Sequence, residues 1–192
     1  MANHDLRNFN PEVFARLDAD MWVAYYNHRF FRLFVLLLKL NYVHFRPSLI
    51  LTTRGAYHSA MAAIVFRKTK GSEDTKQILE HLVQFYRLMA VHNAYAFDYQ
   101  KAAELELEWW LVDRYPDRYK MSRATALAKG MAVIYNVPAV SLKTYGQKRA
   151  AAMELLGDYH YDTAANVDWS KLRKLLRESY TSLHTAVQTD RQ

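Results

Sequence analysis

Two acidic residues stand beside a pair of tryptophans, and their position suggests chemistry. Glu106 and Asp113 are seven residues apart, about two turns of a helix, so a helix would place both on one face. Trp109 and Trp110 share that arc and favour its burial. A buried carboxylate must be paired, protonated or bound to a metal, because an isolated charge in the interior is costly. We therefore expect either a ligand or metal site on this wall, or an ion pair with a buried arginine.

A second polar group lies earlier in the chain. Arg54 and His58 are four residues apart and share a helical face, and Tyr57 adjoins the other apolar face. A lone histidine on such a helix is more often a hydrogen-bonded core residue than a ligand or a base. If folding brings these three residues to Glu106 and Asp113, the pocket would hold an acid, a base and an anion clamp. In an enzymatic version of this hypothesis, a carboxylate or His58 moves a proton while an arginine holds an anionic substrate.

The first helical segment supplies further candidates. Tyr25, His28 and Arg29 fall in an arc that also holds Trp22, when the segment is taken as one helix. Arg29 could hold the anion in place of Arg54. The alternative is that Arg29 extends to solvent or pairs with the acids of the later helix.

Metal binding finds little support in the spacing of carboxylates and histidines. Di-iron sites in helical bundles need carboxylates on four helices and Glu-x-x-His pairs on two, and no Glu lies three residues before any His. Asp158, His160 and Asp162 alternate in a way that could meet a divalent cation, but the glycine turn and closing Glu of a calcium loop are missing. The sequence therefore identifies no cofactor, although a metal ion remains one of the expected ligands.

The elements that must position these residues are predicted to be helices. Of the residues, 51% are hydrophobic and 14% aromatic, which indicates a folded chain, and 5 Gly and 4 Pro are too few for the many turns of an all-β protein. Capping signals divide the chain into about seven helices, the first running from Pro11 to about Phe45 with a break near residues 18–20. We expect an all-α fold, in which an antiparallel four-helix bundle carries three additional packed helices.

The domain organisation and location follow from the same inspection. We expect one domain over residues 10–187, a loose N-terminal tail over 1–9 and a loose C-terminal tail over 188–192. The amino end does not resemble a signal peptide, and the most apolar run, 30–40, is too short and too charged to span a bilayer. The absence of cysteine suits a reducing compartment. A soluble, cytoplasmic protein without a transmembrane segment is therefore predicted.

The net charge of +7 leaves other partners open. The last helix carries four cations beside an apolar stripe, which suits either an ordinary solvent face or contact with phosphate or anionic lipid: Lys171, Arg173, Lys174 and Arg177. The chain has no dense basic block, so binding to nucleic acid is not favoured.

Three classes of function follow, in order of preference. The first is a helical-bundle protein with a buried polar pocket for a small anionic molecule or a metal, which could be an enzyme. The second is an interaction or scaffold protein that forms a homodimer through exposed aromatic residues. The third is binding to nucleic acid or to an anionic membrane through the positive charge.

Overall fold

The computed structural model describes residues 5–45, 49–69, 75–156 and 167–190. Within these ranges the regular structure is helical, which confirms the all-α class. The α-helices are α1 (Pro11–Tyr26), α2 (Phe30–Phe45), α3 (Leu49–Lys68), α4 (Lys76–Val91), α5 (Tyr99–Arg114), α6 (Arg123–Tyr135), α7 (Lys143–Glu154) and α8 (Trp169–Thr189). Two short 3-10 helices, η1 (Pro116–Arg118) and η2 (Ala139–Leu142), lie in the connections before α6 and α7.

The count of about seven helices is wrong, because the first predicted helix is two. The first helix ends at Tyr26. His28 follows with a φ of 55°, in the left-handed region that commonly ends a helix. The Asn27 side chain donates to the Val23 carbonyl at 2.7 Å and satisfies one of the last acceptors of α1. The break expected near residues 18–20 does not occur.

Side-chain caps begin several of the helices, in keeping with the capping signals of the sequence. Asn10 accepts from two amides in the first turn of α1, and Asp98 accepts from the Lys101 amide at 2.9 Å at the start of α5. Ser122 and Asp168 cap α6 and α8 in the same manner. These local hydrogen bonds explain why the sequence shows the helix starts so plainly.

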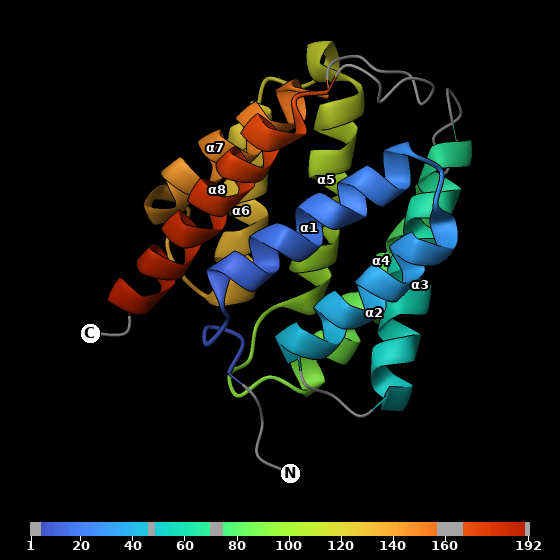
Figure 1. Cartoon of the computed structure of the whole chain (residues 1–192). Coiled ribbons are helices and arrows are strands. Elements are labelled where there is room, and N and C mark those ends of the chain that lie inside the picture. The colour runs from blue at the N-terminus through green and yellow to red at the C-terminus, as the bar shows by residue number, and fades with distance from the viewer. Residues whose placement is uncertain (1–4, 46–48, 70–74, 157–166, 191–192) are drawn as a thin grey trace.

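The helices pack in a closed circuit. Each α-helix contacts the next one along the chain, and α8 also packs against α1. In Figure 1, α6, α7 and α8 form one side of the molecule and α2, α3 and α4 the other, with α1 and α5 between them. The expected four-helix bundle with three added helices is not confirmed, since α1 is shared between its neighbour α2 and the distant α8.

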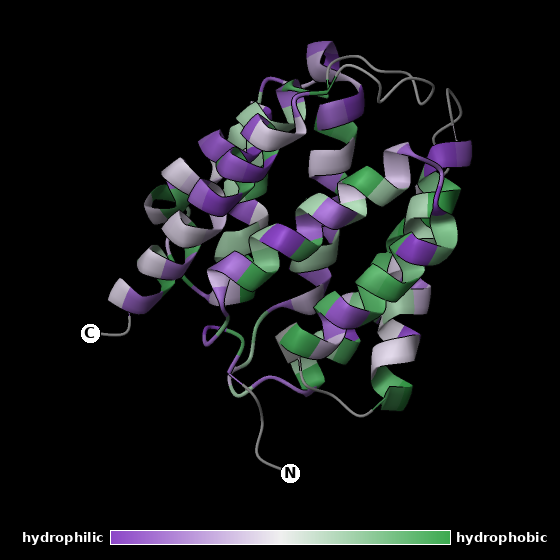
Figure 2. Ribbon diagram, viewed as in Figure 1, coloured by the Kyte–Doolittle hydropathy of each residue, from purple (hydrophilic) through white to green (hydrophobic). Residues whose placement is uncertain are grey.

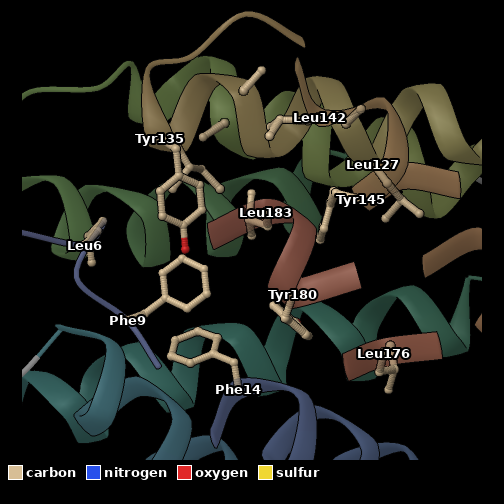
Figure 3. Close-up of a cluster of buried hydrophobic side chains, with 14 of the residues drawn as sticks. Leu6, Phe9, Phe14, Leu127, Tyr135, Leu142, Tyr145, Leu176, Tyr180 and Leu183 are labelled. Carbon is tan, nitrogen blue, oxygen red and sulfur yellow. The ribbon is translucent and has the colours of Figure 1, made fainter. Parts of the chain in front are cut away.

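Aromatic rings fill the core between α1, α6 and α8. Phe9 and Phe14 lie with ring centroids 4.9 Å apart, Phe9 reaches Tyr135 at 5.7 Å, and Phe14 reaches Tyr180 at 5.7 Å (Figure 3). Tyr135 is only 1% exposed. This ring cluster brings the first helix and the last helix together.

The chain ends are packed over the part that the structure describes. Leu6 is 1% exposed and its amide donates to the Asn93 side chain at 3.1 Å, although a loose tail was expected over residues 1–9. Gln188, expected in the other tail, lies in the last turns of α8 and donates to the Arg7 carbonyl at 2.8 Å. Leu6 and Phe9 are both buried, and removal of their apolar side chains from water stabilises the packing of this segment on the core.

None of the helices in the described ranges combines the length and the apolar character needed to cross a membrane, as predicted.

Candidate functional site

A buried ion pair joins three helices of the circuit. The Arg149 guanidinium of α7 pairs with the Asp18 carboxylate of α1, and both side chains are nearly inaccessible. The Tyr180 hydroxyl of α8 donates to Asp18 Oδ2 at 3.0 Å and accepts from Arg149 Nη1 at 3.0 Å. Burial lowers the pKa of Arg149, but the charge of Asp18 and the interactions with Tyr180 and Tyr145 together outweigh it, so the pKa is raised and the guanidinium stays charged.

Glu106 of α5 lies in a second polar group that faces α4. Its Oε2 accepts from the Tyr86 hydroxyl at 3.1 Å and its Oε1 accepts from the Trp110 indole at 3.0 Å. Burial raises the pKa of Glu106, while hydrogen bonds from Trp109 and Tyr86 and the charge of Arg149 lower it. Since Arg149 acts on both acids, the two groups form one electrostatically coupled interior cluster, which we call the interior polar cluster.

Asp113 lies at the far end of the same helix and has a different partner. It forms an ion pair with Arg123, the first residue of α6, and its side chain is 38% exposed. Burial raises the pKa of Asp113, and the charge of Arg123 opposes the shift. Asp113 therefore links α5 to α6 at the rim of the molecule.

The candidates on α3 contact a histidine of α4. His58 Nδ1 lies 3.1 Å from His81 Nδ1, and the Tyr57 ring packs edge-on against both imidazoles. Tyr57 is 52% exposed, and Arg54 is also exposed. His58 and Tyr57 thus contact each other and His81, whereas Glu106 bonds to Tyr86 and Trp110, and Asp113 pairs with Arg123.

The remaining candidates lie where α1 passes into α2. Tyr25 packs edge-on against Tyr26 with centroids 5.3 Å apart, and His28 packs against Phe30 at 5.9 Å. His28 and Arg29 are exposed in the turn. They lead into the outer surface of α2.

Several members of the interior polar cluster were not candidates in the sequence. Asp18 and Arg149 carry a local signal, since each charge stands among apolar and small residues of its helix. Tyr86 and Tyr180 carry none, because a tyrosine on an apolar stripe is equally typical of an ordinary core.

The concavities that we find lie away from this cluster. A hollow of about 20 Å³, roughly the room for one water, lies between α2, α3 and α4 and is lined by Asn41, Thr52, Gly55, Phe85, Met89 and His92 among others. A shallow open depression lies on α8 and is lined by Ser141, Ser182 and Thr185 among others. The described ranges contain no group of three or more potential metal ligands, and Asp158, His160 and Asp162 fall outside them.

The outer surface of α2 and α3 has an unusual composition. Ten large hydrophobic side chains are conspicuously exposed in the described part, and eight of them belong to these two helices: Phe30, Phe31, Tyr42, Val43, Leu49, Ile50, Tyr57 and Ile64. Phe31 is 83% exposed and Ile50 is 73% exposed. Figure 2 shows α2 and α3 with long hydrophobic stretches at the edge of the molecule. Apolar surface of this extent usually marks a contact site.

The same surface is exclusively basic in its charge. Residues 21–72 contain eight Lys or Arg and no Asp or Glu, whereas the other 140 residues contain 18 Lys or Arg and 19 acids. Five of the eight cations are exposed on or next to α2 and α3: Arg29, Arg32, Lys39, Arg54 and Lys68. We call these cations and the eight hydrophobic residues the α2–α3 face. Residues 21–72 thus account for the positive net charge of the chain in sequence, and five of their cations lie on or next to the helices that carry most of the exposed large hydrophobic residues of the described part.

Comparisons with protein-family models, with curated proteins and with solved structures give no match. The fold and these two features define an all-helical protein with a cluster of paired polar side chains in its interior and an apolar, basic outer face.

Proposed function

We propose that this protein binds peripherally to anionic membranes through the α2–α3 face. The observation that supports the proposal is the coincidence of exposed apolar residues with a segment of 52 residues that contains cations and no acid. Helices that lie in the membrane interface combine these two features, because apolar side chains enter the boundary of the acyl chains while Lys and Arg contact anionic headgroups.

The periodicity of both helices fits this orientation. On α2, Phe31, Val35, Leu38 and Tyr42 repeat at intervals of three and four residues, so they lie along one side of the helix. Arg32 and Lys39 both lie along one side of that stripe, and both are exposed. Such an arrangement lets the helix lie flat, with apolar residues toward the lipid and cations at headgroup level.

α3 repeats the pattern beside α2. Ile50, Tyr57 and Ile64 recur every seven residues, and Arg54 and Lys68 lie close to the same side. The Arg67 guanidinium of α3 lies 5.8 Å from the Phe30 ring of α2, so the end of α3 meets the beginning of α2 and the two helices run antiparallel. Two adjacent helices with matching outer sides make a broader contact than one.

Charge decides between this partner and the others that we considered. A homodimer with two-fold symmetry would bring the α2–α3 face of one copy against the same face of the other, so its cations would oppose cations without any acid to pair. Nucleic acid would neutralise the charge, but the aliphatic side chains Leu49, Ile50 and Ile64 provide neither stacking nor hydrogen bonds to bases. An anionic bilayer satisfies both the charge and the apolar groups.

The electrostatic contribution is appreciable. Each cation near an anionic surface contributes about 1 kcal/mol, so the five exposed cations would contribute about 5 kcal/mol at moderate ionic strength. Insertion of exposed side chains such as Phe31 and Ile50 adds to this, at up to about 1.5–3 kcal/mol for each side chain fully removed from water. Binding should be reversible and should weaken with salt.

Co-sedimentation with vesicles tests the proposal. The protein should pellet with phosphatidylcholine vesicles that contain phosphatidylglycerol and remain in the supernatant with phosphatidylcholine alone. The double variant Arg32→Glu/Lys39→Glu should weaken binding at least about tenfold, because it removes about 2 kcal/mol of attraction and adds repulsion. Phe31→Ser should also weaken it.

Matched variants elsewhere serve as controls. Lys129→Glu changes an exposed cation of α6, and Val140→Ser changes a hydrophobic residue of η2 that is 80% exposed. Both should bind vesicles as the wild type does, apart from a small loss from the altered net charge. Equal binding to neutral and anionic vesicles, a stable homodimer with a protected α2–α3 face, or tighter binding to a polynucleotide than to anionic vesicles would each contradict the proposal.

A small anionic ligand bound in the interior is a second candidate, and one observation favours it. Glu106, whose pKa is raised by burial, and the charged Arg149 act on each other inside the protein. An acid and a cation with shifted pKa values in one interior group are typical of binding sites. A thermal shift with small carboxylates or phosphates that disappears in Glu106→Gln would support this function, and the absence of any shift would remove it.

A further inference from the structure

We infer that His58 of α3 and His81 of α4 form a binding site for a divalent transition metal such as Zn²⁺, with two protein ligands and open positions for water. The inference does not rest on the proposed membrane function. It rests on the two imidazoles that face each other across the seam between α3 and α4.

The distance between the two ring nitrogens fits a shared metal. His58 Nδ1 and His81 Nδ1 lie 3.1 Å apart. A tetrahedral Zn²⁺ with Zn–N bonds of about 2.0–2.1 Å holds two ligand nitrogens roughly 3.3 Å apart. A reorientation of both rings, so that the two Nδ1 lone pairs converge on one point, would admit the ion.

The protonation state is also the one that metal binding requires. Only neutral imidazole binds a metal, and burial lowers the pKa of His58, aided by the charges of His81 and Arg54. At neutral pH without metal, one Nδ1 can donate its proton to the other. When the ion binds, each ring carries its proton on Nε2 and offers Nδ1 to the metal, and no proton is lost from the pair.

The surroundings hold the rings in place but supply no third ligand. The Tyr57 ring packs edge-on against His58 at 5.3 Å and His81 at 6.2 Å between centroids, which restricts both imidazoles. The described residues contain no cluster of three or more His, Cys, Asp or Glu side chains. The remaining positions would be taken by water, as in open zinc sites. With two protein ligands, the affinity should be modest.

Binding of the ion would join α3 to α4. A ligand that binds only the folded state stabilises it in proportion to its affinity and concentration. Because Tyr57 belongs to the α2–α3 face, the metal would also fix one edge of that face against the rest of the protein.

Calorimetric titration with ZnCl₂ tests the site. The wild type should bind one Zn²⁺ at about pH 7.5, and binding should weaken as pH falls, because protons compete with the metal for the imidazole nitrogens. His58→Ala and His81→Gln should each weaken binding at least about tenfold, since each removes one of two ligands. Zn²⁺ should raise the melting temperature of the wild type and of neither variant.

Two further variants sharpen the result. His28→Asn removes an exposed histidine of the turn before α2, and Asn tolerates its left-handed backbone, so Zn²⁺ binding should not change. Arg54→Gln should tighten Zn²⁺ binding, because it removes a positive charge that acts on His58. No Zn²⁺ binding by the wild type, or wild-type affinity in both His58→Ala and His81→Gln, would overturn the inference. Neither result would affect vesicle binding, which is measured separately in the presence of a chelator.

Discussion

At the scale of single residues, the interior polar cluster is notable for how completely its charges are met. Asp18 receives the Arg149 guanidinium and the Tyr180 hydroxyl, and Glu106 receives Tyr86 and Trp110. A buried pair of this kind adds little net stability, but removal of one partner leaves an unpaired charge and costs about 3–5 kcal/mol. The residues of the cluster come from α1, α4, α5, α7 and α8. The cluster therefore disfavours any packing in which these five helices do not meet.

Glu106 makes the unfolding free energy depend on pH in a predictable direction. Burial raises the pKa of Glu106 in the folded state. The ionised carboxylate therefore lowers the free energy of unfolding. This loss is absent below the unfolded pKa near 4.5 and develops as pH rises through the folded pKa. Glu106→Gln does not titrate. The variant should therefore gain stability relative to the wild type as pH rises from about 4 to about 7.

Urea unfolding at about pH 4 and about pH 7 measures this difference. Glu104→Gln serves as the matched control, since Glu104 is exposed on the same helix and pairs with Lys101 at 3.2 Å. It should show no such pH dependence. A stability difference for Glu106→Gln that is constant or falls with pH would contradict the burial of the carboxylate.

The sequence revealed only those site contacts that lie within one helix. Glu106 and Trp110 are four residues apart, so helical periodicity places them together, and the structure shows their hydrogen bond. Tyr86 and Arg149 reach the cluster from α4 and α7, and nothing in their local sequence says which helices will touch. For the same reason, periodicity alone could not pair His58 with His81.

At the scale of helices, local sequence signals explain where helices begin better than they explain the break between α1 and α2. Asn10, Asp98, Ser122 and Asp168 are capping residues whose partners lie within three positions, so their role is legible in the sequence. The break between α1 and α2 falls at His28, which adopts a positive φ without glycine or proline nearby. Tertiary packing of α1 and α2 overrides the continuous helical pattern there.

The crossing of α6 and α7 depends on one glycine. A Cβ added at Gly146 would lie 2.2 Å from the Ala124 carbonyl oxygen, and this backbone atom cannot rotate away. Gly146→Ala should force α7 away from α6 and cost about 1–3 kcal/mol or more. Thermal unfolding followed by circular dichroism measures the loss.

Gly130 provides the contrasting substitution within α6. A Cβ at that position meets nothing within 4 Å, so Gly130→Ala should raise stability by about 0.5–1 kcal/mol through its better helix propensity. Similar effects of the two substitutions would mean that α6 and α7 do not approach each other so closely.

At the scale of the whole molecule, the cations of the α2–α3 face and those of α8 differ in whether acids lie close to them. The α2–α3 face holds the cations that have no acids in their segment, whereas α8 pairs its cations with α1 through Arg173 to Asp20 at 2.8 Å and Arg177 to Glu12 at 3.0 Å. The basic pattern of the last helix thus serves packing in part, although the sequence made it the more obvious membrane contact.

The circuit of helices is closed by the beginning of the chain, which gives the last prediction. Leu6 is 1% exposed, and the neighbouring Phe9 packs edge-on against His184 of α8 with centroids 5.2 Å apart. Leu6→Ala should cost about 2–5 kcal/mol, as for other leucines of a closed core. Because the circuit is one cooperative unit, helical dichroism and tryptophan fluorescence should shift to lower denaturant together.

Leu49→Ala is the matched comparison, since Leu49 is 75% exposed at the start of α3. An exposed leucine contributes little to folding, so this variant should change stability by no more than about 0.5 kcal/mol. It should nevertheless weaken vesicle binding, which Leu6→Ala should leave unchanged at temperatures where the variant is folded. Equal stabilities for the two variants would show that the segment before α1 lies outside the cooperative fold, and the closure between α1 and α8 would then depend on the two helices alone.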